Sequence, residues 1–265
     1  MSNNDQIKVH TNIDSDLPGL LGLSEKVLRK FKGIAFLLTL LPIFFIYIFC
    51  IAVSIYPGVL IFKLIPQYLA DQSIWFEVAI YSVAIALAYF LYAFAMVFVV
   101  PLINFILPLK LKESRGNWYS LQVIPWYYHN ALTQLVRYTV LDILTPTPFN
   151  MLFFKMMGMK MGKNCIINTT NISDPCLIEL GDYVTIGGSV TLFAHYGQGG
   201  YLIVGKTTIG DYSTIGLKAS IMGSVNIGKK CMIGPHVVIL PKTVIEDDSI
   251  INLTNVETLV QRGDL

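Results

Sequence analysis

Isoleucine recurs at every sixth position over the second half of this chain, a period that belongs to no α-helix and no ordinary β-strand. It occupies nine consecutive places at that interval: Ile203, Ile209, Ile215, Ile221, Ile227, Ile233, Ile239, Ile245 and Ile251. Small or β-branched residues stand four positions after each of the first eight, from Thr207 to Ser249. This six-residue repeat predicts a parallel β-coil whose interior is filled by the aliphatic residue, with three repeats to each triangular turn.

The repeat extends upstream with two interruptions. Met161 and Ile167 begin it, one extra residue precedes Leu180, and Leu180, Ile186 and Leu192 continue it. Eleven residues then separate Leu192 from Ile203 where six would suffice, so we expect five residues to leave the coil within His195–Tyr201. Coils that begin at 161, 180, 203, 221 and 239 give five turns over residues 161–256, about 24 Å tall.

The first half of the chain holds most of the apolar residues. Residues 33–62 form a run of thirty without a charged side chain, and residues 78–109 form another of thirty-two. About twenty apolar residues span a bilayer, so the two runs predict a transmembrane helical hairpin over 33–109. The alternative is a pair of buried core helices, although uncharged runs of this length are rare in soluble proteins. The first run is also about twice too long for a cleaved signal peptide.

Basic residues flank the hairpin on one side. Lys26, Arg29, Lys30 and Lys32 precede the first run, and Lys110, Lys112 and Arg115 follow the second. The short loop at 66–73 has neither Lys nor Arg. The positive-inside bias therefore places the tail at 1–32, the second half of the chain and the tail at 257–265 on the cytoplasmic side of the inner membrane.

Residues 110–160 read as a connector of helices at the membrane surface. Trp118, Trp126, Tyr127 and Tyr128 are of the types that settle among lipid headgroups, and apolar residues recur at helical spacing from Leu132 to Ile143. We expect a helix that lies along the bilayer, with aromatic side chains that anchor it. The predicted fold class is thus α plus β-solenoid: two transmembrane helices and interfacial helices, followed by a β-helix of about five coils.

Composition excludes other classes of protein. Hydrophobic residues make up 54% of the chain and charged residues only 14%, and the net charge is +2, which gives no electrostatic case for nucleic acid as a partner. The four cysteines form no CxxC pair, which favours a reduced, cytosol-facing compartment.

The loop at the second interruption is the candidate functional segment, because inserted loops in regular solenoids often carry function. It contains His195 together with Gly197, Gly199 and Gly200. Histidine has the unperturbed pKa, about 6.5, that suits a general base near neutral pH. His236 lies in a regular repeat at a corner position, which favours a structural role, and we assign no chemical role to His10 or His129. With only two histidines in the β-helix and no His-x4-His pair, no metal site is expected.

The residues also resemble a known family. Residues 161–255 are similar to the left-handed β-helix of the hexapeptide-repeat acyltransferases, and VTLFAH, which ends at His195, resembles the stretch that ends in their catalytic histidine. Over residues 109–244 the chain also resembles, more closely, the membrane-anchored, Pls-type acyltransferase-like modules of nonribosomal peptide synthetases. The sequences that carry this likeness are LKLK, Trp126-Tyr127-Tyr128, TPF at 147–149, FFKMMGMKMG, SDPCLIELGD and IGPHVVILPK. Unlike those synthetases, this chain shows no adenylation or carrier domain.

The resemblance implies a function and a site. It implies direct transfer of an acyl or aminoacyl group from acyl-CoA or an acyl-phosphopantetheine carrier to an amine or hydroxyl, without a covalent enzyme intermediate and with His195 as general base. By position it implies that the donor lies in a groove lined by Gly216, Leu217, Lys218, Pro235, His236 and Lys242. For Lys218 and Lys242, a solvated outer face is an equally good interpretation. The family generally builds its site between the prisms of a trimer, so a homotrimer is expected, with the lipid bilayer and a possible acyl or peptidyl carrier protein as further partners.

Other functions stay open on the sequence alone. The acceptor could be a sugar hydroxyl of a surface polysaccharide or lipid-linked sugar, which would make the chain an O-acetyltransferase. The β-helix could also be a non-catalytic membrane scaffold. A metal-dependent lyase on the same fold is disfavoured by the number of histidines.

Overall fold

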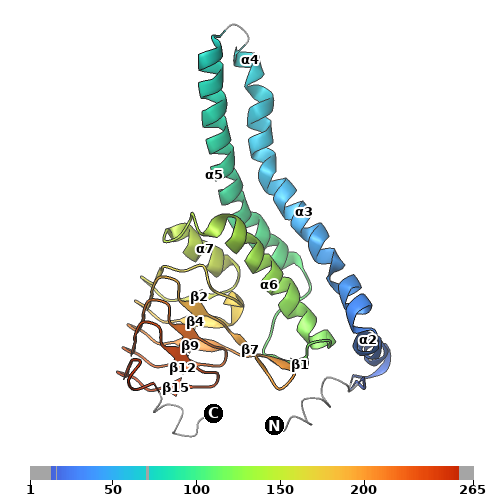
Figure 1. The fold of residues 1–265 in the computed structure, drawn as a ribbon, viewed down its shortest axis with the longest axis vertical. Helices are drawn as coiled ribbons and strands as arrows, with labels where there is room; N and C mark the ends of the chain where they lie inside the picture. The colour runs from blue at the N-terminus through green and yellow to red at the C-terminus, as the bar shows by residue number, and fades with distance from the viewer. Residues whose placement is uncertain (1–12, 16, 70–71, 257–265) are drawn as a thin grey trace.

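The computed structural model describes residues 13–15, 17–69 and 72–256. A helical hairpin stands out from one end of a prism of β-strands, and shorter helices lie between the two (Figure 1). Most of the predicted N-terminal tail before residue 13, with His10, and the predicted tail at 257–265 lie outside the described residues.

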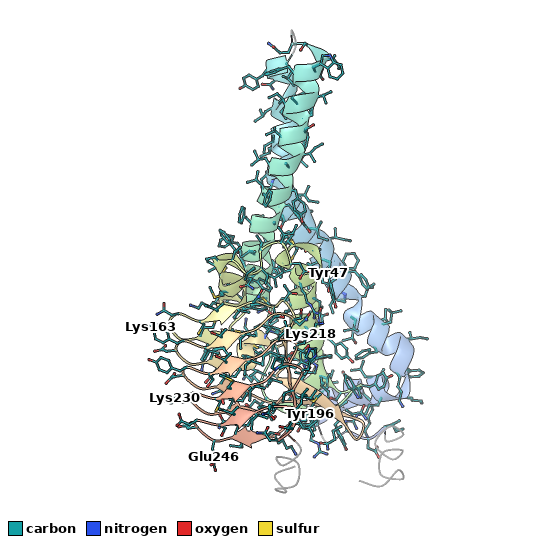
Figure 2. The ribbon with its side chains drawn as sticks, turned by 60° about the vertical axis from the view of Figure 1, so that its left-hand side comes forward. Tyr47, Lys163, Tyr196, Lys218, Lys230 and Glu246 are labelled. Carbon is teal, nitrogen blue, oxygen red and sulfur yellow. The ribbon has the colours of Figure 1, made fainter. Side chains whose placement is uncertain are left out.

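The hairpin consists of two helices of equal length. The first half of the chain forms α2 (Gly19–Lys30), α3 (Lys32–Leu64), α4 (Pro66–Leu69) and α5 (Ile74–Ile106). α3 and α5 lie side by side and are long and apolar enough to cross a membrane. Phe45 and Ile48 on α3 are each 65% exposed, as is Val83 on α5. Side chains stand out all around the upper part of this helical hairpin (Figure 2), so that part is not buried within the chain.

The predicted parallel β-helix is confirmed, because strands of successive coils pair in three parallel sheets. The first sheet has the order β15 (Val244–Ile245), β12 (Asn226–Ile227), β9 (Thr207–Ile209), β4 (Ile178–Leu180), β2 (Lys160–Met161). The second has the order β16 (Ile250–Ile251), β13 (Met232–Ile233), β10 (Thr214–Ile215), β5 (Thr185–Ile186), β3 (Ile166–Ile167). The third has the order β14 (Val238–Ile239), β11 (Ser220–Ile221), β6 (Thr191–Leu192).

The register follows the six-residue period with one correction. Leu180, Ile209, Ile227 and Ile245 stack on one another in the first sheet, and each is buried. Ile203 is not part of this stack, because it lies in an antiparallel hairpin formed by β7 (His195–Gln198) and β8 (Tyr201–Val204). The excursion from the coil is therefore longer than the predicted loop. The spacing from Ile203 to Ile209 is six residues, so the hairpin imitates the period without belonging to the coil.

The connector packs on protein more closely than its sequence suggests. It contains β1 (Ser114–Asn117), the 3₁₀ turn η1 (Leu121–Val123), α6 (Ile124–Val136), the π-helical turn η2 (Arg137–Leu141) and α7 (Pro148–Met156). Trp126 and Tyr128 on α6 are 9% and 7% exposed, and Tyr128 Oη donates to the Thr39 carbonyl oxygen of α3 over 2.8 Å. The prediction that these two aromatic residues anchor the connector among headgroups is therefore wrong, because both are buried against the protein.

One hydrophobic core joins the three parts. It runs from Met96 of α5 through Val136 of α6 and Phe153 of α7 to Ile167 and Ile186 in the first coils of the β-helix. The hairpin and the prism are thus packed on the same connector helices.

Candidate active site

The first interruption of the repeat brings a carboxylate into the wall of the β-helix. Ile172 still pairs with Leu192 of β6, and the backbone N–H of Ser173 donates to the Leu192 carbonyl oxygen over 3.0 Å. Asp174 then turns into the left-handed region, with φ 57° and ψ 47°, and Pro175 begins the 3₁₀ turn η3 (Pro175–Leu177). Aspartate tolerates this conformation better than most residues do. Ile172 follows Ile167 by five residues and precedes Leu180 by eight, so this turn holds two residues more than the period of six and the stretch before it holds one fewer.

The carboxylate of Asp174 meets the predicted base. Asp174 Oδ2 lies 2.5 Å from His195 Nδ1 and also accepts the backbone N–H of Ala194 over 3.3 Å. The Asp174 side chain is fully buried, whereas 19% of the His195 side chain is exposed. A carboxylate at Nδ1 favours the tautomer with the proton on that nitrogen, which leaves the lone pair of Nε2 as the basic site.

His195 is the first residue of the β7–β8 hairpin, at the point where that hairpin leaves the coil. Gly223 lies on the next coil directly against it, and a Cβ at Gly223 would come within 2.6 Å of the His195 backbone nitrogen. Only glycine allows this close approach of the two coils. The position of the imidazole is thus set by backbone stacking as well as by Asp174.

Two aromatic rings enclose the imidazole. The Phe193 ring stacks on it with 5.2 Å between centroids and an interplanar angle of 22°. The indole of Trp126, from α6, meets it edge-on at 4.9 Å. Trp126 also packs with Val123, Leu202 and Val204 in a small cluster between the connector and the hairpin. The connector therefore forms one wall of the site, a contact that was not predicted.

The β7–β8 hairpin pairs with β1, a strand of the connector. β1 pairs antiparallel with β8, and β8 pairs with β7, so that the three strands form one small sheet. The backbone N–H of Lys206, just after β8, donates to the Glu113 carboxylate over 2.9 Å. This sheet orders the segment around His195 within a single chain, without a neighbouring subunit.

Two further titratable groups lie near the pair. Burial lowers the pKa of His129 on α6 to about 4, with the charge of Asp174 opposing that effect, so this imidazole is neutral at neutral pH. Burial, together with the Asp174 carboxylate, raises the pKa of the Cys176 thiol to about 12. Cys176 is therefore protonated near neutral pH and poorly suited to act as a nucleophile.

The residues predicted to line the donor groove lie at two corners of the prism. Gly216, Leu217 and Lys218 share one corner with Pro235 and His236 of the next coil, where the His236 N–H donates to the Leu217 carbonyl oxygen over 2.9 Å. Lys218 and His236 have φ angles of 55° and 58° there, as expected for corner residues. Lys242 lies at the following corner, where its N–H donates to the Gly223 carbonyl oxygen over 3.4 Å beside His195.

One chain therefore brings only Lys242 to the corner of His195. The sheet β6–β11–β14 separates the other five residues from that corner. Over residues 13–15, 17–69 and 72–256, no three His, Cys, Asp or Glu side chains are grouped as metal ligands. A reaction without a metal stays a prediction.

Sequence reasoning missed Asp174, Trp126 and His129 as site residues. The register break between Ile167 and Leu180 was visible, and an aspartate followed by proline at such a break is a usable signal. The roles of Trp126 and His129 had no such signal, because they depend on where α6 packs against the β-helix.

No family model matches the chain, but several curated proteins are similar to it. "Putative acetyltransferase YvoF" of Bacillus subtilis is 30% identical over 129 residues, which are 44% of this chain and 70% of that protein. "Putative colanic acid biosynthesis acetyltransferase WcaF" of Escherichia coli is 29% identical over 113 residues, which are 37% of this chain and 57% of WcaF. "Delta-poly-L-ornithine synthetase" of Acinetobacter baumannii is 22% identical over 189 residues, which are 70% of this chain and only 13% of the synthetase.

Solved structures are similar at a lower level. A serine acetyltransferase of Neisseria gonorrhoeae aligns over 96% of this chain and 80% of its own length, with 12% identity and a TM-score of 0.34. A similarity of this size carries no conclusion about the site.

Proposed function

The chain belongs to the hexapeptide-repeat acyltransferases, and we propose that it transfers an acyl or aminoacyl group from a CoA or phosphopantetheine thioester to an amine or hydroxyl acceptor. The observation that supports this proposal is the contact of 2.5 Å between Asp174 Oδ2 and His195 Nδ1 at the root of the hairpin. A partly exposed imidazole oriented by a buried carboxylate is the arrangement that general-base catalysis requires.

The reaction proceeds by direct transfer in this proposal. His195 Nε2 takes the proton of the acceptor N–H or O–H as that atom attacks the thioester carbonyl. The tetrahedral intermediate then collapses, the C–S bond breaks, and the proton held by His195 passes to the departing thiolate. Asp174 stabilises the imidazolium between these two steps. General-base assistance of this kind contributes about 10² to 10⁴ in rate.

The state of Cys176 supports direct transfer over an acyl-enzyme intermediate. Cys176 lies two residues after Asp174, and its pKa of about 12 keeps the thiol protonated at neutral pH. Thioester exchange onto cysteine requires the thiolate. The neighbouring carboxylate disfavours that thiolate further.

We further propose that α3 and α5 anchor the site to the cytoplasmic face of the inner membrane. The support is their length and apolar composition, their exposed apolar side chains, and the basic residues that flank the pair. The prism then faces the cytoplasm, where CoA and carrier thioesters are available, and the acceptor is a lipid-linked or membrane-proximal compound.

The donor groove is proposed to form between subunits of a homotrimer. Within one chain, five of the six groove residues lie one corner away from His195. In a trimer, the same corner of a neighbouring prism would lie against this histidine. Leu217, at the corner of these five residues, is 49% exposed in the single chain. Val238, on the sheet β6–β11–β14 between that corner and His195, is 48% exposed. Apolar side chains at that position are available to pack against a neighbouring prism.

A sugar hydroxyl is the second candidate acceptor. The similarity to WcaF, a putative colanic acid biosynthesis acetyltransferase, favours O-acetylation of a surface polysaccharide or its lipid-linked precursor. The similarity to a poly-ornithine synthetase favours an amine instead.

The test uses full-length protein in detergent with acetyl-CoA and two panels of acceptors, amines and sugars. We expect thiol release that depends on one panel and falls by at least about 10²-fold in His195→Ala. The matched control is Asn226→Ala, an exposed outer position on β12. Equal release by the wild type and His195→Ala with every acceptor would refute the proposed function and favour a non-catalytic scaffold.

A further inference from the structure

Helix α6 presents several side chains to the Asp174–His195 pair from one face. Trp126, His129 and Asn130 lie at positions i, i+3 and i+4, which share a face of an α-helix. Trp126 contacts the His195 ring, and Asn130 Oδ1 accepts a hydrogen bond from Ser173 Oγ over 2.9 Å. The charge of Asp174 acts on the His129 imidazole, so the two side chains lie near each other.

His129 and Asp174 each have one buried polar atom without a partner in the described part of the chain. These atoms are His129 Nε2 and Asp174 Oδ1. His129 is 3% exposed and Asp174 is fully buried, so bulk water does not reach either of them. Buried polar atoms are nearly always hydrogen-bonded, and an unpaired one costs about 1 to 3 kcal/mol. The two atoms are not hydrogen-bonded to each other in the structure, and one water between them would satisfy both.

The protonation of His129 matches this pairing. Burial keeps the imidazole neutral, and the charged groups that act on it are Asp174, which raises its pKa, and Lys110, which lowers it. A neutral imidazole has one N–H and one lone pair. Asn104 Oδ1, near the end of α5, lies 3.0 Å from His129 Nδ1, a placement in which Nδ1–H would donate to that oxygen. The amide oxygen and nitrogen exchange places by a half-turn, so Asn104 is able to donate to Nδ1.

We propose that His129 is a positioning residue whose Nε2–H donates through one water to Asp174 Oδ1, while the Asn104 amide, turned by a half-turn, donates to Nδ1. The inference rests on the proposed function, because it treats Asp174 and His195 as the catalytic pair. Both oxygens of the carboxylate are then bound, one by His129 through the water and one by His195 and Ala194. A chain of side chains connects Asn104, at the end of the second apolar helix, to the catalytic base.

Two substitutions at one position test the contact. The amide nitrogen of glutamine reaches the place of the imidazole Nε2, whereas that of asparagine reaches only the place of Nδ1. His129→Gln therefore keeps a donor for Asp174, and His129→Asn removes it. The control is Tyr128→Phe, which removes a partly buried hydrogen bond from the same helix to α3 and leaves Asp174 unchanged.

The readout is the pKa of His195, which needs no substrate. The rate of carbethoxylation of His195 by diethylpyrocarbonate is measured against pH by peptide mass spectrometry, with exposed His236 in the same digest as the reference. Without this donor, the negative charge of Asp174 is less neutralised and stabilises the imidazolium of His195 more strongly. We expect the apparent pKa of His195 to rise by about one unit in His129→Asn and to stay unchanged in His129→Gln and Tyr128→Phe.

A second measurement uses the wild-type chain and so does not depend on how the variants fold. The protein is labelled with ¹⁵N-histidine, and the signal of His129 is the one lost in His129→Gln. We expect the Nε2–H tautomer, with no titration between pH 5 and 9. The Nδ1–H tautomer would overturn the proposal, as would equal shifts of the His195 pKa in the Gln and Asn variants or no shift in either.

These outcomes separate the inference from the proposed function. A chain that transfers no acyl group with any acceptor would refute the function, whereas the tautomer of His129 and the pKa of His195 would still decide whether the contact exists.

Discussion

At the scale of single residues, the charge of Asp174 should matter more than its size. Asp174→Asn keeps the shape of the side chain but removes the charge that stabilises the imidazolium of His195 and favours its tautomer. We expect kcat for acyl transfer to fall by about 10²-fold or more, with little change in the KM for acetyl-CoA. Asp182→Asn is the matched control, because that aspartate also accepts a backbone N–H at a corner, from Lys163 over 2.7 Å, and does not contact His195. Similar losses in both variants would contradict the assigned role.

The buried imidazole of His129 should make the folding stability of the chain depend on pH. Its pKa of about 4 in the folded chain lies below the value of about 6.5 for a free imidazole, so the unfolded chain binds this proton first on acidification. The unfolding free energy therefore has its full value above about pH 6.5. As the pH falls from about 6.5 toward 4 it decreases, by about 3 kcal/mol in total, because protonation of His129 favours the unfolded chain. Thermal unfolding in detergent between pH 4.5 and 7.5 should therefore show a weaker pH dependence in His129→Gln than in the wild type or Tyr128→Phe. Parallel curves would show that His129 is not buried in this way.

At the scale of elements, each short strand of the β-helix has one inward and one outward position. On β13, Ile233 is 1% exposed and its neighbour Met232 is 53% exposed. Ile233→Asp would place an unpaired carboxylate inside the coil and should cost several kcal/mol of unfolding free energy, whereas Met232→Asp should cost less than about 0.5 kcal/mol. Thermal unfolding of the two variants measures the difference. The inward assignment of every sixth residue fails if both melt alike.

Lys229 also has an outward position in the repeat, but it is a poor outer control. Its Nζ lies 2.9 Å from Asp211 Oδ2 in an exposed ion pair, and its N–H donates to Asp247. A glutamate there would meet two like charges. The structure therefore changes which outer substitutions are expected to be neutral.

At the scale of the whole molecule, the hairpin predicts which sites reach the far side of the membrane. Tyr68 at the tip, in α4, is 78% exposed, and Lys229 on the prism is exposed as well. In intact cells, an impermeant maleimide should label Tyr68→Cys and should not label Lys229→Cys until the membrane is opened. The reverse pattern would overturn the cytoplasmic placement of the β-helix, and with it access to cytosolic thioesters.

A site shared between subunits of a trimer predicts that two inactive variants can complement each other. His195→Ala removes the base, and Leu217→Trp obstructs the corner proposed to face the histidine of a neighbouring subunit. Mixed trimers of the two inactive variants should regain part of the activity, since one of their interfaces combines an intact histidine with an intact groove. Mass measurement in detergent accompanies the assay. A stable monomer, or a trimer in which mixing restores nothing, would place the whole site within one prism.

The β-helix was predictable from the sequence because its geometry repeats locally: each inward residue stacks on its equivalents in neighbouring coils, so a period of six in the sequence becomes a stack in space. His195 was predictable for the same reason, as the histidine at the largest break in that period. Ile203 shows the limit, because a hairpin residue that happens to keep the period cannot be told from a coil residue without the strand pairing.

The partners of His195 were decided only by the tertiary structure. Asp174 precedes His195 by 21 residues and reaches it because two extra residues between Ile172 and Leu180 turn the chain at a corner. Trp126 and His129 reach the same place through the packing of α6 between the hairpin and the prism. Spacing along a chain determines elements that repeat, because each repeat meets its neighbours in the same way. A site made by the docking of unlike elements has no period, and its geometry follows from the packing of the whole core.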